Sequence, residues 1–398
     1  MPNGLPGGGA CGRRLAGRGR PGHGTAIIVR VKTPTKTRAN SATRRGAATI
    51  EVVAQHAGVA PMTVSRVLNG ATNVRESTRI KVKASIAALN YVPNQAAQRL
   101  AGSEQIRIGV LYSNPSSAYL SEFLVGLLDQ ASRSHVQLVV EKCEAGARED
   151  DAARELIANG IDGLILPPPL CDAKRLLQLI QSTGTPAVQV ATGSPAAGVS
   201  AVGIDDKLAA TDMTRHLLAL GHQRVAFITG NPNQTASARR LAGYRTAMAE
   251  AGITADDALV AQGLFNYRSG LDAAEQLLSR DPRPTAIFAS NDDMAAATVA
   301  AAHRMGIDVP SDLTVVGFDD TAIATTIWPE LTTIRQPIAE MARSALQQLV
   351  RRIRARRNGE DDGAEHQVMD FTLVRRQSDA APRMRPPARI ATPERSRR

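Results

Sequence analysis

A short stretch near the start of the chain carries side chains suited to contacts with nucleic acid. Residues 53–70 read VAQHAGVAPMTVSRVLNG, and the second half presents Met62, Thr63, Ser65, Arg66 and Asn69. A guanidinium group can donate two hydrogen bonds to one guanine in the major groove. Short hydroxyl and amide side chains suit phosphate oxygens, which fix the register of a protein on DNA. The side-chain types therefore predict a base-reading surface, with Met62 and Arg66 toward the bases.

Two short helices are predicted to position these side chains. Apolar residues spaced as one helical face begin at Ile50 and predict a first helix. Thr49 is suited to cap the start of that helix, and Gly58 is suited to end it in a left-handed conformation. Pro61 suits the first turn of a second helix, because its missing N–H would have no partner there.

A third helix is predicted from Val82, Ile86 and Leu89. Three short helices with a glycine turn between the first two predict a helix-turn-helix, whose second helix enters the major groove. The alternative is a small three-helix bundle whose polar residues are merely solvated. Residues 49–102 hold six basic and two acidic residues, which favours DNA binding.

The net charge of +11 on the 398 residues is unevenly placed. Residues 1–48 hold ten Lys or Arg and no acid, residues 377–398 hold six and two, and residues 103–376 are net acidic. This pattern indicates a polyanionic partner for the ends only, although basic tails can also be solvated arms. Both tails are rich in Pro and Arg and are predicted to be disordered. The GRGRPG motif at Gly17–Gly22 lacks the flanking strand and helix of a dinucleotide site.

The composition indicates a cytoplasmic chain with no membrane partner. No run approaches the ~18 apolar residues that cross a bilayer, and no signal-peptide core is visible. Cys11, Cys143 and Cys171 are widely spaced without a CxxC pair. This spacing favours a reducing compartment and argues against a zinc site. No metal and no cofactor is predicted.

The stretch TIEVVAQHAGVAPMTVSRVLNG, with TRIKVKASIAALNYVPNQAAQRLAG after it, resembles the DNA-binding head of the LacI/GalR family of bacterial repressors. The resemblance runs without a gap over residues 49–102, and two departures from it are Ala60 and Arg75, where relatives often carry Ser. It implies further DNA contacts from Thr49, Pro61, Tyr91 and Asn94.

The resemblance also implies a hinge helix over residues 93–102 that folds only on the operator, as a symmetric pair. Ala97 would pack in the minor groove, and Leu100 would wedge apart the central base step, at a cost offset by the contacts that the bend permits. An isolated helix of this length is too short to be stable in water, which independently predicts disorder without DNA.

Residues 103–376 alternate short apolar runs with helical patterns such as Ala147–Asn159 and Ala236–Glu250. This order predicts doubly wound parallel sheets, and the number of strands favours two lobes with a cleft between the strand ends. The predicted strands are Ile106–Tyr112, Val136–Glu141, Gly163–Pro169, Ala187–Ala191, Arg224–Gly230, Thr285–Ser290 and Thr314–Asp320.

The motifs GHQRVAFITG, ARRLAGYRTAM, ASNDDMAAATVAAAHRMGIDVPSDLTVVGFDD and LTTIRQP resemble the family's two-lobed sensor, which is related to periplasmic sugar-binding proteins. The resemblance implies that residues 103 to about 203, with a late return near Ile327–Ile334, form one lobe. It also implies that this body dimerises. The fold class is thus α/β: a two-lobed periplasmic-binding-protein-like sensor with an N-terminal all-α helix-turn-helix head.

The resemblance implies a polar effector grip in the cleft from Arg240, Asn291 and Asp319. Phe265 occupies the family's stacking position, and Gln336 is a further lining candidate. Residues in the loop after the first strand of the first lobe would close over the ligand, namely Asn114, Ser116 and Tyr119. Asn291 could instead cap the helix at Asp292–Arg304, and Asp319 could cap the turn that follows it; both roles are compatible with binding. Relatives that carry an acidic ligand contact after the fourth strand differ from this chain, which has Ala191.

These observations predict a transcriptional repressor that binds a palindromic operator as a dimer and is released by a small-molecule inducer, in family terms a carbohydrate. A purine-type corepressor mechanism is the alternative, and a periplasmic-type sugar-binding protein is a distant one. The histidines lack paired metal spacing, and no nucleophile or phosphate-loop motif is present, so no enzyme is predicted. Residues 377–398 show no leucine heptad, which favours a dimer over a tetramer.

Overall fold

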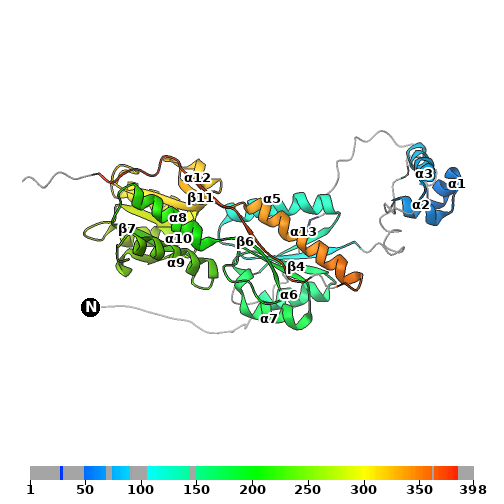
Figure 1. Cartoon of the computed structure of the whole chain (residues 1–398), viewed down its shortest axis with the longest axis horizontal. Helices are drawn as coiled ribbons and strands as arrows, with labels where there is room; N and C mark the ends of the chain where they lie inside the picture. Colours follow the sequence, from blue (N-terminus) through cyan, green and yellow to red (C-terminus); the bar gives the residue numbers. More distant parts are fainter. Residues whose placement is uncertain are drawn as a thin grey trace, which may run out of the picture.

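The computed structural model describes residues 27–29, 49–68, 74–89, 91, 105–143, 149–360 and 363–383. They form an all-α head and an α/β body of two lobes, so the predicted fold class is confirmed (Figure 1). The predicted hinge at residues 93–102 lies outside the described residues. In the described part of the chain, no helix combines the length and apolarity needed to cross a membrane.

The head consists of α1 (Ile50–Ala57), α2 (Pro61–Leu68) and α3 (Glu76–Ala88). Thr49 caps α1 by accepting a hydrogen bond from the N–H of Val52 at 3.4 Å, and Gly58 ends it with φ +66°. The core is a small apolar cluster of Val53, Ala54, Val64, Val67 and Val82. These features confirm the predicted helix-turn-helix, and α3 lacks a side-chain cap at Arg75, as its residue type indicates.

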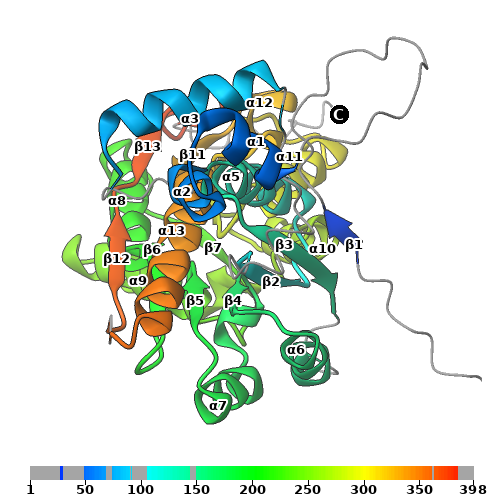
Figure 2. The ribbon, with the colours of Figure 1, turned by 90° about the vertical axis from the view of Figure 1, so that its right-hand side faces the viewer.

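The first lobe is built on a seven-stranded sheet with the order β1-β3-β2-β4-β5-β6-β12, in which only β1 is antiparallel to its neighbour. Its helices cover both faces, because the central strands are apolar on both sides: α5 and α13 share one apolar cluster, and α6 and α7 share another (Figure 2). The elements are β1 (Ile27–Val29), β2 (Arg107–Tyr112), α5 (Ser117–Ser134), β3 (Gln137–Lys142), α6 (Glu149–Ala158), β4 (Gly163–Leu166), η1 (Leu170–Asp172), α7 (Lys174–Thr183), β5 (Ala187–Val190), β6 (Ser200–Ile204), α13 (Ile338–Arg357) and β12 (His366–Met369).

The second lobe has a six-stranded sheet with the order β13-β11-β10-β9-β7-β8. Helices α8 and α9 pack on one face, and α10 and α11 pack on the other. The elements are α8 (Asp206–Ala219), β7 (Val225–Thr229), α9 (Thr235–Glu250), η2 (Asp257–Leu259), β8 (Val260–Gln262), α10 (Tyr267–Leu278), β9 (Ala286–Ala289), α11 (Asp292–Arg304), β10 (Thr314–Asp319), α12 (Ile323–Thr326), β11 (Thr332–Arg335) and β13 (Thr372–Val374).

The return of the chain to the first lobe differs from the expectation from the sequence. The segment predicted to return, Ile327–Ile334, stays in the second lobe, where β11 pairs in parallel with β10. The return is instead made by α13 and β12, after which β13 pairs with β11. An apolar strand pattern does not specify which of two similar sheets it joins, so the prediction placed the crossing too early. The chain therefore crosses between the lobes after β6, after β11 and after β12.

The C-terminal boundary also needs correction, because the ordered body extends to Arg383 rather than ending at residue 376. Ser378 is fully buried, donates to the carbonyl of Val315 at 2.5 Å and accepts from the N–H of Thr332 at 2.9 Å. Asp379 accepts a hydrogen bond from the Thr332 hydroxyl at 2.5 Å. The polar, Pro- and Arg-rich composition of residues 377–398 predicts disorder, so these few buried contacts could not be predicted from the sequence. In the N-terminal tail, which was predicted to be disordered, the structure describes only β1, which pairs antiparallel with β3.

Candidate functional site

The second helix of the head presents its polar face outward. Val64 and Val67 are buried against α1 and α3, so the side chains between them face away from the core. Met62 is 63% exposed and Arg66 is exposed, while Thr63 and Ser65 are half-buried beside them. The structure thus brings these four predicted DNA contacts onto one side of α2.

The remaining predicted DNA contacts fall in three places. Pro61 is the exposed first residue of α2, and Thr49 is exposed at the start of α1, where its hydroxyl caps the helix. Tyr91 is half-buried against the head core, and its N–H donates to the carbonyl of Ile86 at 3.0 Å. The other predicted contacts lie outside the described residues, namely Asn69, Asn94, Ala97 and Leu100.

In the body, all eight predicted effector residues line one cavity between the lobes. From the first lobe come Asn114 in the loop after β2, Ser116 at the N-cap of α5, and Tyr119 inside α5 rather than in the loop predicted for it. From the second lobe and its crossing come Arg240, Phe265, Asn291, Asp319 and Gln336. The cleft is almost closed, since seven of these eight side chains are at most 8% exposed.

Arg240 is the central polar group of the cavity. It lies on α9, its Nε donates to Asp206 Oδ1 at 2.8 Å, and its Nη1 donates to the carbonyl of Ser290 at 2.5 Å. Its guanidinium carbon lies 3.6 Å from the centroid of the Phe318 ring, a stacking that suits a planar cation. Nη1 also lies 3.7 Å from Asp319 Oδ1. The guanidinium is thereby held in one orientation, with Asp319 beside it.

Asp319 ends strand β10 in a backbone conformation with φ +110°, which is unusual for a residue with a side chain. Gln336 Nε2 donates to its Oδ1 at 2.6 Å. Burial raises the pKa of Asp319 to about 7, although Arg240 and Gln336 act in the opposite direction. Two further cavity residues, Ala191 and Phe265, have φ of +56° and +60°. Such backbone strain gathers at binding sites, where surrounding contacts maintain it.

The elevated pKa of Asp319 makes its contribution to stability depend on pH. The folded chain keeps this proton up to about pH 7, whereas an unfolded Asp loses it near pH 4. The contribution is therefore complete below about pH 4 and is lost as the pH rises through about 7. Asp319→Asn should gain stability relative to the parent by on the order of 2 kcal/mol between pH 5 and pH 8. Urea unfolding of both proteins at the two pH values measures this; a constant difference would contradict it.

Asn291 both caps a helix and lines the cavity between the lobes. Its Oδ1 accepts from the N–H of Met294 at 3.0 Å, which caps α11, and its Nδ2 donates to the carbonyl of Phe265 at 3.2 Å. The capping role considered from the sequence is therefore real, and the residue also lines the cavity.

Two buried polar atoms of the cavity residues have no hydrogen-bond partner among the described residues. They are the hydroxyl of Tyr119 and Oε1 of Gln336. An unpaired buried polar atom costs roughly 1–3 kcal/mol, so such atoms are normally satisfied by another protein group, by water or by a ligand. One is on each side of the cleft, and both are suited to a ligand that carries hydroxyl groups.

Comparison with known proteins agrees with this architecture. Residues 49–94 match the family described as bacterial regulatory proteins of the lacI family, and residues 214–378 match the periplasmic binding protein-like domain. The ribose operon repressor of Escherichia coli K12 is 34% identical over 310 residues, which cover 77% of this chain and 93% of that protein. The chain belongs to the LacI family. It is a DNA-binding transcriptional regulator and not an enzyme, as predicted.

Two solved structures of LacI-family proteins are similar over nearly their whole length. The complex of the regulator CelR with cellobiose has a TM-score of 0.64 and 32% identity, covering 83% of this chain and 99% of that one. The lac repressor dimer bound to operator and the anti-inducer ONPF has a TM-score of 0.67 and 30% identity, covering 84% and 100%.

Several residues around the cavity of this LacI-family protein were not predicted from the sequence. Asp206, which positions Arg240, begins α8 directly after β6, and an acidic pair at the end of that strand was the available signal. Gln234 and Ala236 line the wall at the start of α9. Pro115 and Pro168 complete the lining from the first lobe without a chemical signature in the sequence.

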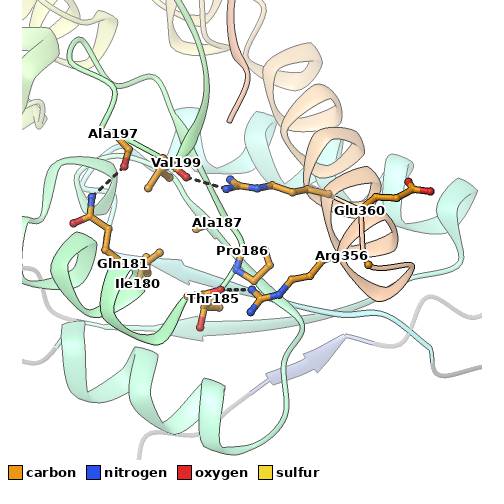
Figure 3. A pocket seen from close by; sticks show the side chains of 13 residues that line it. Ile180, Gln181, Thr185, Pro186, Ala187, Ala197, Val199, Arg356 and Glu360 are labelled. Atoms are coloured by element: carbon orange, nitrogen blue, oxygen red, sulfur yellow. Dashed lines mark hydrogen bonds between the residues drawn. The ribbon is translucent and has the colours of Figure 1, made fainter. Parts of the chain in front are cut away.

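A larger cavity of about 550 Å³ lies in the first lobe between α7 and the end of α13. Its guanidinium groups are already used within the protein: Arg352 donates to the carbonyl of Gly198 at 2.9 Å, and Arg356 donates to the carbonyl of Gly184 (Figure 3). These two arginines join α13 to the neighbouring loops, which favours the smaller cleft between the lobes as the candidate effector site. Among the described residues, no group of three His, Cys, Asp or Glu could hold a metal ion.

Proposed function

We propose that this LacI-family protein is a cytoplasmic repressor that binds a palindromic operator as a dimer and releases it when a small carbohydrate enters the cleft. The observation that carries the ligand class is the pair of unpartnered atoms, Tyr119 Oη and Gln336 Oε1, facing a cavity that also holds Arg240 and Asp319. Guanidinium, carboxylate and amide groups together suit adjacent hydroxyls, and Phe265 offers an apolar surface. The similarity to a cellobiose complex and to a ribose operon repressor supports the carbohydrate class.

The proposed DNA contacts follow from the exposed face of α2. Arg66 and Met62 would meet base edges in the major groove, while Thr63, Ser65 and Asn69 would hold phosphates. Thr49, Pro61 and Tyr91 would lie at the edges of this contact, and Asn94, Ala97 and Leu100 would enter the minor groove. The effector would act by shifting the population between two lobe arrangements that differ in operator affinity.

A binding assay at fixed salt tests this proposal. Operator affinity of the full-length protein is measured by fluorescence anisotropy with a panel of mono- and disaccharides and with purines. We expect one saccharide to weaken operator binding roughly 5- to 150-fold, the usual range of allosteric coupling. Tightening by a purine would replace the inducer mechanism with a corepressor mechanism, and an operator affinity indifferent to every saccharide would reject the carbohydrate class.

A dimer contact is proposed at Trp328, the only tryptophan of the chain, which is 76% exposed in the loop between α12 and β11. Large exposed aromatic side chains are typical centres of interfaces. Trp328→Ala should weaken dimerisation roughly 30-fold, which corresponds to about 2 kcal/mol for the central residue of an interface. Sedimentation measures this, with the exposed Met305→Ala as control. If Trp328→Ala dimerises as strongly as the parent protein, the interface lies elsewhere.

A further inference from the structure

One carboxylate of the first lobe reaches across to a helix of the second. Asp172 lies at the end of η1 and is not part of the cavity lining. Its Oδ2 accepts from the N–H of Thr235 at 2.8 Å, and its Oδ1 accepts from the Thr235 hydroxyl at 2.9 Å. Thr192, from its own lobe, donates its hydroxyl to Oδ1 at 2.7 Å. The carboxylate therefore joins the two lobes through both of its oxygens.

The contact falls where α9 lacks a cap of its own. Thr235 is the first residue of α9, and the preceding Gln234 makes no side-chain capping bond. The first N–H groups of a helix have no partner within the helix, and a negative charge is stabilised beside them. Asp172 supplies both the acceptor and the charge, but it does so from the opposite lobe.

The loop around Gly193 in the first lobe also closely contacts the start of α9. The N–H of Gly193 donates to the Thr235 hydroxyl at 2.8 Å. A Cβ at Gly193 would lie 3.0 Å from the backbone carbonyl carbon of Thr235 and 2.7 Å from Cγ of Arg239. Only a glycine therefore lets this part of the first lobe touch the start of α9 without displacement.

Helix α9 also carries two residues of the cavity wall, Ala236 and Arg240. The distance between its first turn and the first lobe consequently sets the width of the cleft. We propose that Asp172 is a positioning residue, a cap supplied from one lobe to α9 of the other, which holds the cleft closed in the absence of any ligand. That the closed cleft receives an effector rests on the proposed function, whereas the closure itself does not.

The test uses the full-length protein without ligand and follows amide hydrogen exchange by mass spectrometry. Asp172→Asn keeps the size of the side chain but leaves one acceptor oxygen instead of two. We expect amide exchange to accelerate roughly tenfold both at the start of α9 and in the loop around Gly193. This factor corresponds to the loss of one charge-assisted hydrogen bond. We also expect a larger radius of gyration in small-angle X-ray scattering. Gly193→Ala, which removes no hydrogen-bonding group, should have the same two effects.

The matched control is Asp256→Asn, because Asp256 accepts from the N–H of Ala258 at 2.9 Å within the second lobe, at η2. This control should accelerate exchange only locally and leave the radius of gyration unchanged. Faster exchange in Asp172→Asn confined to residues around η1, with parental scattering, would overturn the proposal and leave Asp172 as a local loop contact. Because no effector is added, failure of the carbohydrate proposal would not alter either result.

Discussion

Arg240→Ala is expected to abolish the response to inducer while leaving operator binding in place. The substitution removes the only guanidinium within 4 Å of Asp206 and Asp319 among the described residues and leaves both acidic side chains buried without a cation. Breaking a buried pair in this way costs about 3–5 kcal/mol. Separately, an effector held by hydrogen bonds to the guanidinium should bind at least 100-fold more weakly, because charge-assisted hydrogen bonds worth about 3 kcal/mol are lost.

The measurement is inducer titration of the operator complex, with Arg239→Ala as the matched control. Arg239 is the preceding residue of α9, its side chain is 47% exposed, and it pairs with Asp205 at 3.5 Å outside the cavity. The control should respond normally. If Arg240→Ala is too unstable to purify, Arg240→Lys can be used instead. It keeps the charge but loses the planar guanidinium group, so its operator binding should likewise not respond to inducer. Normal induction in either Arg240 variant would remove this residue from the site.

Arg66→Ala should erase the preference for operator over random DNA while general DNA binding persists. The Arg66 side chain is exposed on α2 and carries no part of the head core, so the fold should be unaffected. Loss of a bidentate base contact costs about 1–3 kcal/mol, or roughly 5- to 150-fold in affinity for each half-site of the operator. Binding to random DNA depends on phosphate neutralisation and should fall far less, with at most a small change in its salt dependence.

Titrations of operator and random duplexes at several salt concentrations measure this difference. Lys83→Ala is the control: Lys83 is exposed on α3, away from the predicted base contacts, so any effect should be equal on both DNAs. Arg66→Lys should behave like the alanine variant in specificity, because an ammonium group cannot make the planar pair of hydrogen bonds. An equal loss on operator and random DNA in Arg66→Ala would assign this residue to phosphate.

In the head, local sequence patterns correctly predicted where the first two helices begin and where the first one ends. A cap at Thr49, a left-handed Gly58 and a proline at the first turn of α2 are each required by local backbone chemistry, and each is found in its predicted place. Seven strands of the body were predicted correctly, since central parallel strands are continuous apolar runs. The interior strand β6 was not predicted, because its short run SAVGI includes a serine and a glycine. Short edge strands such as β8 and β12 were also not predicted, because a half-buried edge carries a weaker pattern.

The sequence by itself determined which elements form and, by resemblance, which side chains gather in the cleft, because helix caps, strand runs and family motifs are local properties of the chain. Only the tertiary structure decided which sheet β11 joins, that Ser378 belongs to a core, and that Asp172 caps a helix of the other lobe. These three outcomes depend on contacts between residues far apart in the chain. A hydrogen bond between Asp172 and Thr235 spans 63 positions, and no local pattern records its partner.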